Sequence, residues 1–389
     1  MISGIGQSAI GRRLPQSAIA LVVEACNKAI TDAGLEASDI DGISTFPGMH
    51  TNPGFSPVGV YELQNAMRFE LAWYNGAFET PGPCGSMVMA SAAVEAGLAT
   101  HVLCFRGHKE GSAQGSGGRA SLVQSEVDGT VPAATAGRDW SWQMPFGVVS
   151  IANFAAMHAQ RHFQMFGTSR EQLAQIAITC RKNASLNPSA LHRDPLSLEE
   201  YLSARMISDP LCLFDCDIPC DAATAVIVSS SDRTSELRRP PIQLESIGCA
   251  NKGRFLWDQW EDMTTQGSVH SAEMLWSRTS LTPTDVDLAL LYDGFSIFTL
   301  MWIESLGFCG IGEAGSFIEQ GKAIGREGPL PINTHGGLSA GRVHGNGLFY
   351  EACLQLWGAA GERQLPSNPE VAVVAAGGGP TTACFLLTV

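Results

Sequence analysis

The sequence predicts an α/β fold made of two similar halves, with a different region inserted between them. A Leu-x-x-x-Asp-[Ile/Val]-Asp run followed by an apolar strand occurs twice, in residues 35–46 and 281–292. A second unit, a helix, a loop or glycine stop and then a strand, occurs in residues 84–107 and again in residues 347–379. Repeated units indicate an internal duplication. Strands that alternate with helices favour parallel sheets covered on both faces.

Length and composition agree with a large folded protein. The chain has 389 residues, more than one simple hydrophobic core organises, so two halves or domains are expected. Hydrophobic residues make up 45% of the chain and charged residues 16%, which excludes a disordered protein. The net charge of -14, with no basic run against it, argues against nucleic acid as the main partner.

The cysteines and the N-terminus indicate where the protein works. Eleven cysteines are scattered through apolar segments, and Cys212, Cys216 and Cys220 flank aspartates without forming a metal-ligand pattern. We therefore predict no metal site and a reducing cytoplasm. The N-terminus has no charged-then-apolar leader, and no apolar run is long enough to span a bilayer. A soluble protein without membrane contact is expected.

The N-terminal half is assigned to residues 1–110. A helix is expected from about Ser17 to Ala33, because its apolar positions recur with helical spacing and Gly34 is a good stop. The other elements expected in this half are a strand at 1–7, a strand ending near 46, a helix at 87–96 and a strand at 100–105. Part of residues 220–235 returns to this half, as the apolar strand 223–228.

The middle and the end of the chain complete the pattern. Residues 111–235 are assigned to an insertion, or loop, region that begins with the Gly/Ser-rich stretch 111–118 and contains a long helical stretch, 154–180. Residues 236–389 form the C-terminal half. It contains a helix after 347 and a strand at 371–376 that runs into three glycines.

Four short motifs resemble one known family. They are residues 167–174 with Asn187-Pro188, residues 210–221, Tyr292-Asp-Gly-Phe-Ser296, and Gly336-Gly337-Leu338. In this order they resemble the thiolase superfamily over nearly the whole chain. The most similar branch is that of the sterol-carrier-protein-like thiolases, which includes the lipid-transfer-protein aldolases of steroid side-chain degradation. The resemblance implies a thiolase-like duplicated αβαβα five-layer core with a central insertion domain.

The stretch Asn333 to Ala352 combines the features of a site. Its glycines allow the backbone to approach a ligand, and the helix that follows begins with unpaired N–H groups. His344 lies between them and titrates near neutral pH. The alternative is a glycine-rich loop with a structural histidine.

Cys84 is a second candidate because it stands just before a helix. The helix dipole and the free N–H groups of the first turn favour a thiolate there. Degradative thiolases use such a cysteine as nucleophile. Cys84 lies about one helical turn closer to Gly97 than the family pattern requires, a spacing that resembles the aldolase-like members. A small buried cysteine at a helix start is the alternative.

Other positions depart from the thiolase pattern together. The second family cysteine is replaced in Ala375-Ala376-Gly377, no Gly-His-Pro follows Gly337, and Tyr292 stands where the family often has histidine. The resemblance then implies retro-aldol chemistry, which needs a base for a 3-hydroxyl group and donors for the thioester oxygen. Tyr292 is the candidate base, Asp293 beside it is a further catalytic candidate, and His344 is a candidate acid, base or oxyanion donor. A strand-end tyrosine held by a hydrogen bond is the alternative for Tyr292.

Substrate contacts are expected from Gly336, Gly337, Arg342 and Gly378. Coenzyme A is expected as part of the substrate, with no covalently bound cofactor. Three functions remain open: a retro-aldolase for a branched 3-hydroxyacyl-CoA, a degradative thiolase that uses Cys84 and free CoA, and a non-catalytic thiolase-like subunit. The resemblance also implies a homodimer core and a small zinc-ribbon/OB-fold partner protein, together a heterotetramer.

Overall fold

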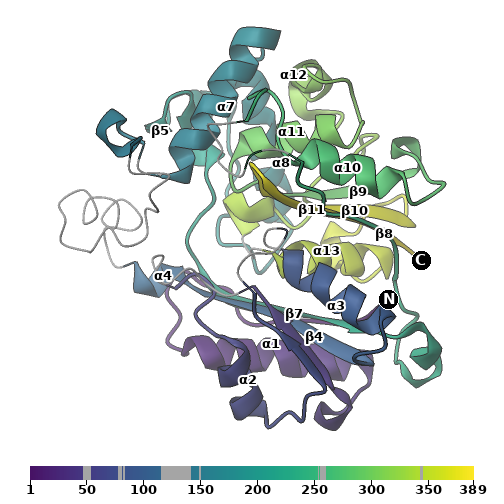
Figure 1. The fold of residues 1–389 in the computed structure, drawn as a ribbon. Coiled ribbons are helices and arrows are strands. Elements are labelled where there is room, and N and C mark those ends of the chain that lie inside the picture. The colour runs from purple at the N-terminus through teal and green to yellow at the C-terminus, as the bar shows by residue number, and fades with distance from the viewer. Residues whose placement is uncertain are drawn as a thin grey trace.

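The chain folds into five layers, in which two sheets alternate with three layers of helices (Figure 1). This computed structural model describes residues 1–46, 54–77, 81, 84–114, 142–148, 150–252, 254, 260–341 and 345–389. The layers run from outer helices through a sheet, a central pair of helices and a second sheet to further outer helices. The predicted duplicated αβαβα core is therefore confirmed.

The first sheet is built by the N-terminal half and one returning strand. Its order is β1-β7-β4-β2-β3. The strands are β1 (Ile2–Gln7), β2 (Gly42–Thr45), β3 (Trp73–Asn75), β4 (His101–Lys109) and β7 (Asp221–Ser229). Strand β2 is parallel to β3 and β4, whereas β7 is antiparallel to β1 and β4. Strand β7 comes from the segment expected to return to this half.

The second sheet repeats the first. Its order is β8-β11-β10-β9, with strands β8 (Gln243–Gly248), β9 (Leu288–Leu291), β10 (Val371–Gly378) and β11 (Thr381–Thr388). Strand β11 is antiparallel to both of its neighbours, as β7 is in the first sheet. Strand β10 is parallel to β9, as β4 is to β2. The same order and directions show the duplication. The expectation of parallel sheets is correct for only part of each sheet, since β2 is parallel to β3 and β4, and β10 is parallel to β9. In the second sheet, the two-residue connection from β10 to β11 permits only antiparallel pairing.

The repeated sequence pattern has the same structural role in both halves. In each copy the first aspartate closes a 3-10 turn: Asp39 accepts from the backbone N–H of Glu36, and Asp285 accepts from that of Thr282, both at 2.7 Å. The second aspartate accepts backbone N–H groups where the neighbouring parallel strand begins. Asp41 accepts from Thr100 and His101 at the start of β4, and Asp287 accepts from Glu370 and Val371 at the start of β10.

Helices cover the sheets on both faces. Helix α1 (Ala18–Ala33) packs on the outer face of the first sheet, beside α2 (Val60–Met67). Helices α3 (Gly85–Glu95) and α13 (Asn346–Leu356) lie between the two sheets, and α10 (Ser268–Trp276) and α11 (Ser296–Ser305) cover the second sheet from outside (Figure 1). The predicted start of α1 is correct, since Ser17 accepts the N–H of Ala20, and Gly34 ends the helix with φ +80°.

The insertion packs on the C-terminal half. The single helix expected at 154–180 is instead two, α7 (Ile151–Phe166) and α8 (Arg170–Ser185), because Gly167 adopts φ +75° and Ser169 caps the second helix. The chain continues through α9 (Leu198–Leu202) and the short strands β5 (Met206–Ser208) and β6 (Leu211–Cys212). Of the Gly/Ser-rich stretch 111–118, residues 115–118 lie outside the described residues. Helix α8 packs against α11 and against the turn Gly337–Gly341.

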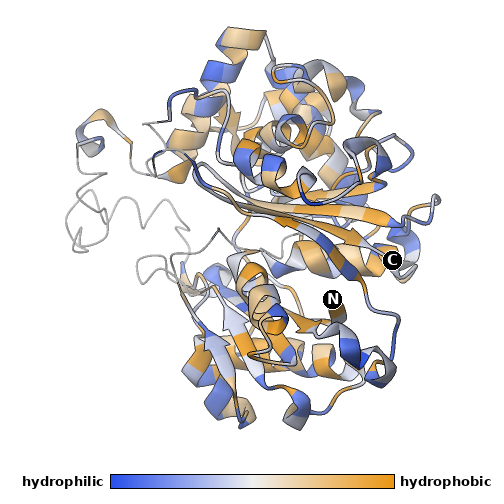
Figure 2. Cartoon of the chain, turned by 45° about the vertical axis from the view of Figure 1, so that its right-hand side comes forward, coloured by the Kyte–Doolittle hydropathy of each residue, from blue (hydrophilic) through white to orange (hydrophobic). Residues whose placement is uncertain are grey.

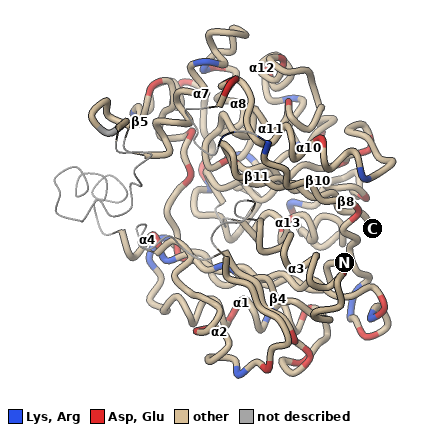
Figure 3. Tube along the Cα trace, in the orientation of Figure 1, with Lys and Arg blue, Asp and Glu red and all other residues tan. Residues whose placement is uncertain are grey.

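Apolar and charged residues are separated as this layering requires. Apolar residues fill the sheets and the faces of the helices turned toward them (Figure 2), whereas charged residues gather on outer helices and loops (Figure 3). In the core, the rings of Phe349 on α13 and Phe385 on β11 meet edge to face at 4.9 Å. Among the described residues, no helix has both the length and the apolar character needed to cross a membrane.

Candidate functional site

Cys84 is the residue before the first turn of α3 and is fully buried. Burial raises the pKa of its thiol to about 12, and the positive charge of Arg106 only partly opposes this effect. The thiol is therefore protonated at neutral pH. A nucleophilic cysteine needs the opposite shift of its pKa.

Arg106 is a buried cation that sequence reasoning missed. It lies on β4 with its guanidinium 5.0 Å from the ring centre of Phe46 and 4.5 Å from that of Phe55, and its Nε donates to Ser56 Oγ at 2.7 Å. The signal in the sequence is an arginine that directly follows the apolar run Val102–Phe105. Its charge lowers the pKa of Cys84, which shows that Arg106 contributes a positive potential to the layer between the two sheets.

Tyr292 follows the last residue of β9. Its backbone N–H donates to the carbonyl of Ala375 on β10, and its carbonyl accepts from Thr299 Oγ1. The half-buried ring stacks on Phe298, with centres 6.3 Å apart and planes at 17°. Tyr292 packs against the same hydrophobic cluster that contains Cys84. Because this cluster extends over both sheets, their meeting in one site stays a prediction.

Asp293 binds the glycine loop. Its carboxylate accepts from the backbone N–H of Leu338 at 2.8 Å and from the N–H and hydroxyl of Ser339 at 3.2 and 2.9 Å. Burial raises the pKa of Asp293 to about 6, although these hydrogen bonds lower it. Because its oxygens are occupied by the loop, the geometry favours a positioning role over direct proton transfer.

Gly336 and Gly337 lie in this loop with φ +105° and +67°. A Cβ on Gly337 would stand 2.2 Å from Asp293 Oδ2, and one on Gly336 would stand 2.6 Å from the Cβ of Ala184. Gly378, at the end of β10, faces the ring of Phe298, where a Cβ would stand 2.8 Å from a ring carbon. All three glycines are needed for close packing, and their predicted contact with substrate stays a prediction.

The loop is also tied to the strand that leads to Tyr292. The side chain of Asn333 accepts the N–H of Leu291 at 2.8 Å and donates to its carbonyl at 2.9 Å, as a neighbouring strand would. Asn183 of the insertion donates to the carbonyls of Ile332 and Asn333. All these groups are buried. The loop and the end of β9 therefore form one rigid unit, a feature that sequence reasoning missed.

Arg342 and His344 lie outside the described residues. Beyond them, Gly345 has φ +73° and Asn346 begins α13. Asn346 is fully buried, and its Nδ2 donates to the carbonyl of Cys104 on β4 at 3.2 Å. Its Oδ1 has no hydrogen-bond partner among the described residues. Asn346 was not singled out from sequence, although it stands in a Gly-Asn-Gly run of the stretch that was.

Within the described ranges, no three His, Cys, Asp or Glu side chains gather closely enough to hold a metal ion.

Comparisons with known proteins place the chain among acyl-CoA enzymes. Residues 250–387 match the family described as thiolase C-terminal domain-like. Over 393 residues the chain is 33% identical to the 17-hydroxy-3-oxo-4-pregnene-20-carboxyl-CoA lyase of Mycobacterium tuberculosis, covering 99% of this chain and 98% of that protein. It is 32% identical over 398 residues to the steroid side-chain-cleaving aldolase of Thermomonospora curvata, with 99% and 97% covered. The solved Ltp2-ChsH2(DUF35) aldolase has a TM-score of 0.85 and 30% identity, covering 100% of this chain and 97% of that one.

Proposed function

The chain belongs to the thiolase superfamily, in the branch of the steroid side-chain-cleaving aldolases, and we propose that it is a retro-aldolase for a branched 3-hydroxyacyl-CoA. The products are a ketone or aldehyde and a shorter acyl-CoA. Similarity over nearly the full length to two named carbon–carbon bond-cleaving proteins carries this assignment. Coenzyme A takes part as the carrier of the acyl group, and no covalently bound cofactor is needed.

The proposed reaction begins when Tyr292, reacting as its phenolate, takes the proton from the 3-hydroxyl group and becomes a phenol. As the carbonyl of the ketone forms, the bond between the second and third carbons breaks, and its electron pair moves into the thioester as an enolate. Donors near the thioester oxygen stabilise that charge. The second carbon then takes up a proton, which releases the shorter acyl-CoA. His344 is proposed as the donor to the oxyanion or as the acid for the last step.

Asp293 acts through the loop that it binds. Its contacts with Leu338 and Ser339 hold the chain segment that leads to His344, directly beside the strand end that carries Tyr292. A base must be held within hydrogen-bond reach of the proton it removes, so rigidity here contributes to the rate.

A degradative thiolase is the second candidate, because Cys84 has the place of a thiolase nucleophile before α3. Two observations oppose it. Burial raises the pKa of the thiol to about 12, and the alanines 375–376 stand where the family has its second cysteine. A thiolase without that acid–base partner lacks a route for its protons.

Product analysis separates the two functions. The substrate is 17-hydroxy-3-oxo-4-pregnene-20-carboxyl-CoA, taken from the name of the mycobacterial relative. Retro-aldol cleavage of this 3-hydroxyacyl-CoA gives a steroid ketone and a three-carbon acyl-CoA without free CoA. Thiolysis requires free CoA and a bulky 3-oxoacyl-CoA, which is assayed in parallel. In Tyr292→Phe, kcat is expected to fall by about 10²–10⁴-fold with little change in KM. A fully active Tyr292→Phe enzyme contradicts the role given to the hydroxyl group.

We also propose that the chain works as a homodimer joined to a small zinc-ribbon/OB-fold protein, as a heterotetramer in the cytoplasm. Three observations support this. Strand β3 lies at the edge of the first sheet, and Tyr74 on it and Tyr61 beside it are exposed, with ring centres 6.0 Å apart. The similar solved structure is named as an aldolase with a DUF35 protein. The eleven cysteines favour a reducing compartment.

Light scattering on the chain alone and after co-expression with such a partner tests the assembly. A Tyr74→Asp variant is expected to shift the chain alone from dimer to monomer, since a charge opposes pairing at a strand edge that the dimer would bury. A fully active chain that stays monomeric, or that gains nothing from the partner, contradicts the proposal.

A further inference from the structure

The end of the insertion runs alongside the segment that follows β9. Cys216 forms an antiparallel bridge with Phe295, and the backbone N–H of Asp217 donates to the carbonyl of Gly294 at 3.0 Å. These residues of the insertion lie in the motif 210–221, to which the proposed reaction gives no role so far. The pairing places Asp217 directly opposite Gly294.

The side chain of Asp217 points to the face on which the hydroxyl group of Tyr292 lies. In paired segments, successive side chains point to opposite faces, and directly opposite residues share a face. Cys216 and Phe295 both pack in the core that the insertion shares with the C-terminal half, so Asp217 and Gly294 point the other way. A Cβ on Gly294 would stand 2.2 Å from the hydroxyl oxygen of Tyr292. The carboxylate and the hydroxyl group are therefore on the same side of the pairing.

The distance between these two groups is short. The Cβ atoms of directly opposite residues are about 4.5–5.5 Å apart, which puts the Cβ of Asp217 within about 8 Å of the hydroxyl oxygen of Tyr292. The carboxylate extends beyond Cβ, so it reaches the hydroxyl group directly or through one water molecule. A second observation agrees. Burial is the main cause of the raised pKa of Asp293, and the negative charge of Asp217 raises it further, so this charge lies at the end of β9.

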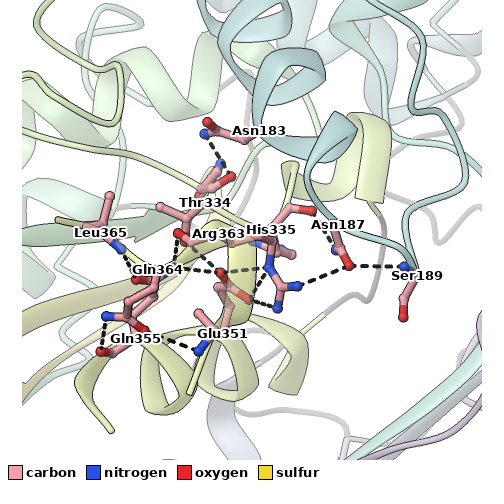
Figure 4. Close-up of polar contacts among 12 residues, drawn as sticks. Asn183, Asn187, Ser189, Thr334, His335, Glu351, Gln355, Arg363, Gln364 and Leu365 are labelled. Carbon is pink, nitrogen blue, oxygen red and sulfur yellow. Dashed lines mark hydrogen bonds and ion pairs between the residues drawn. The ribbon is translucent and has the colours of Figure 1, made fainter. Parts of the chain in front are cut away.

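Asp293 does not provide the same service, although it is the next residue after Tyr292. Its carboxylate accepts from the glycine loop. That loop is held from its other end as well, because Thr334 donates to Glu351 at 2.8 Å and Arg363 donates to the same carboxylate at 2.9 Å (Figure 4). Asp293 is thus fixed in its contacts with the loop, whereas Asp217 is only half-buried.

We propose that Asp217 is a further catalytic residue, the carboxylate that takes the proton from the hydroxyl group of Tyr292 and so forms the phenolate. The inference rests on the proposed retro-aldolase function. The phenolate takes the proton of the 3-hydroxyl group and is a phenol again when the carbon–carbon bond breaks. Asp217 releases its proton to solvent, and the second carbon of the product takes one up, so no proton is gained or lost in the cycle. A positioned base contributes about 10²–10⁴-fold to a rate.

Two variants of Asp217 separate proton transfer from a structural role. Asparagine keeps the shape of the side chain but accepts no proton, whereas glutamate keeps the carboxylate on a longer side chain. With the purified full-length protein and the acyl-CoA named above, Asp217→Asn is expected to lower kcat at least about 10²-fold with little change in KM. Asp217→Glu is expected to be at least about ten-fold faster than Asp217→Asn. A residue needed only for its shape gives the opposite order.

Asp194→Asn is the matched control. Asp194 is an exposed aspartate elsewhere in the insertion, and its variant is expected to keep the kcat of the wild type.

Variants of Tyr292 show whether the two side chains act as one unit. Asp217→Asn is expected to slow the wild type but not Tyr292→Phe, since the proton to be transferred is then missing. Urea unfolding gives a readout that needs no activity. The loss of unfolding free energy in the double variant Asp217→Ala with Tyr292→Phe is expected to be smaller than the sum of the two single losses, as for residues in contact.

The inference is overturned if Asp217→Asn is fully active or is faster than Asp217→Glu. It is also overturned if Asp217→Asn slows Tyr292→Phe as much as it slows the wild type. A wild type that does not cleave the acyl-CoA refutes the proposed function instead. The unfolding measurements then still decide on the contact between Asp217 and Tyr292, which additive losses contradict and non-additive losses support.

Discussion

Replacing Gly294 by alanine tests whether the hydroxyl group of Tyr292 must stay where β9 ends. A Cβ on Gly294 would stand 2.2 Å from the hydroxyl oxygen of Tyr292 and 2.3 Å from its Cζ. Ordinary contact begins at 3.4 Å, so the end of the ring must move by about 1.2 Å. The ring of Phe298, 6.3 Å away between centres and buried against Gly378, limits the space on one face of the Tyr292 ring. The hydroxyl group is therefore displaced rather than merely crowded.

The expected loss follows from this displacement. Moving a reacting group by about 1 Å costs about 10²-fold in rate. We therefore expect Gly294→Ala to lower kcat by about 10²-fold, with KM for the acyl-CoA nearly unchanged because the CoA part does not depend on Tyr292. Overpacking at this site is expected to cost about 1–3 kcal/mol of folding free energy. Urea unfolding at the assay temperature checks that the variant remains folded.

A double-mutant cycle makes the test specific. If the alanine acts only through the hydroxyl group, Gly294→Ala combined with Tyr292→Phe is no slower than Tyr292→Phe alone. Steady-state cleavage of the same acyl-CoA by all four proteins gives the four rates. Full activity of folded Gly294→Ala, or a double variant whose loss is the product of the two single losses, refutes the reasoning.

Three further predictions concern buried charges and the thiol. Cys84→Ala is expected to lower kcat less than about ten-fold, without any requirement for free CoA, because a thiol with a pKa of about 12 is no nucleophile at neutral pH; near-complete loss of product formation excludes this view. Asp293 has a raised pKa of about 6 in the folded state, so its contribution to stability is largest below pH 4 and is lost as the pH rises through 6. Between pH 4 and pH 7, the free energy of unfolding of the wild type is expected to fall by about 2–3 kcal/mol relative to that of Asp293→Asn, as measured in urea. If the free energies of the two proteins depend on pH in the same way, the raised pKa is contradicted. Arg363→Met leaves the buried carboxylate of Glu351 unpaired and is expected to cost about 3–5 kcal/mol in the same assay, with much of the loss restored by adding Glu351→Gln; a smaller loss than about 1 kcal/mol contradicts the pairing.

Local sequence determined the elements and their repetition. The aspartates of the two Leu-x-x-x-Asp-[Ile/Val]-Asp runs could be read from sequence because the first of each binds a backbone group only three residues away. The helix boundaries at Ser17 and Gly34 have the same local origin. The break at Gly167 also had a local signal, a glycine followed by a Ser-x-x-Gln cap, and the long helix expected across it overlooked that signal.

Only part of the candidate site could be predicted from the sequence. Tyr292 and Asp293 were found because they directly follow an apolar strand, and parallel α/β folds carry polar side chains at such strand ends. The partner of Asp293 lies 45 residues further on, at Leu338, and no local pattern connects the two. The same holds for Asn333, which pairs with Leu291 across 42 residues. The roles predicted for Arg342 and His344 are based on the sequence alone.

Tertiary structure alone decided the electrostatics. The sequence places Cys84 before a helix, a setting that lowers the pKa of a thiol, yet burial between the two sheets raises it. The cation of Arg106 is buried beside aromatic rings from segments about 50 to 60 residues away. His335 is neutral because α13 and the loop that carries Arg363 enclose it. Burial and charge depend on neighbours that only folding brings together, so the residue types came from the sequence and their protonation states came from the fold.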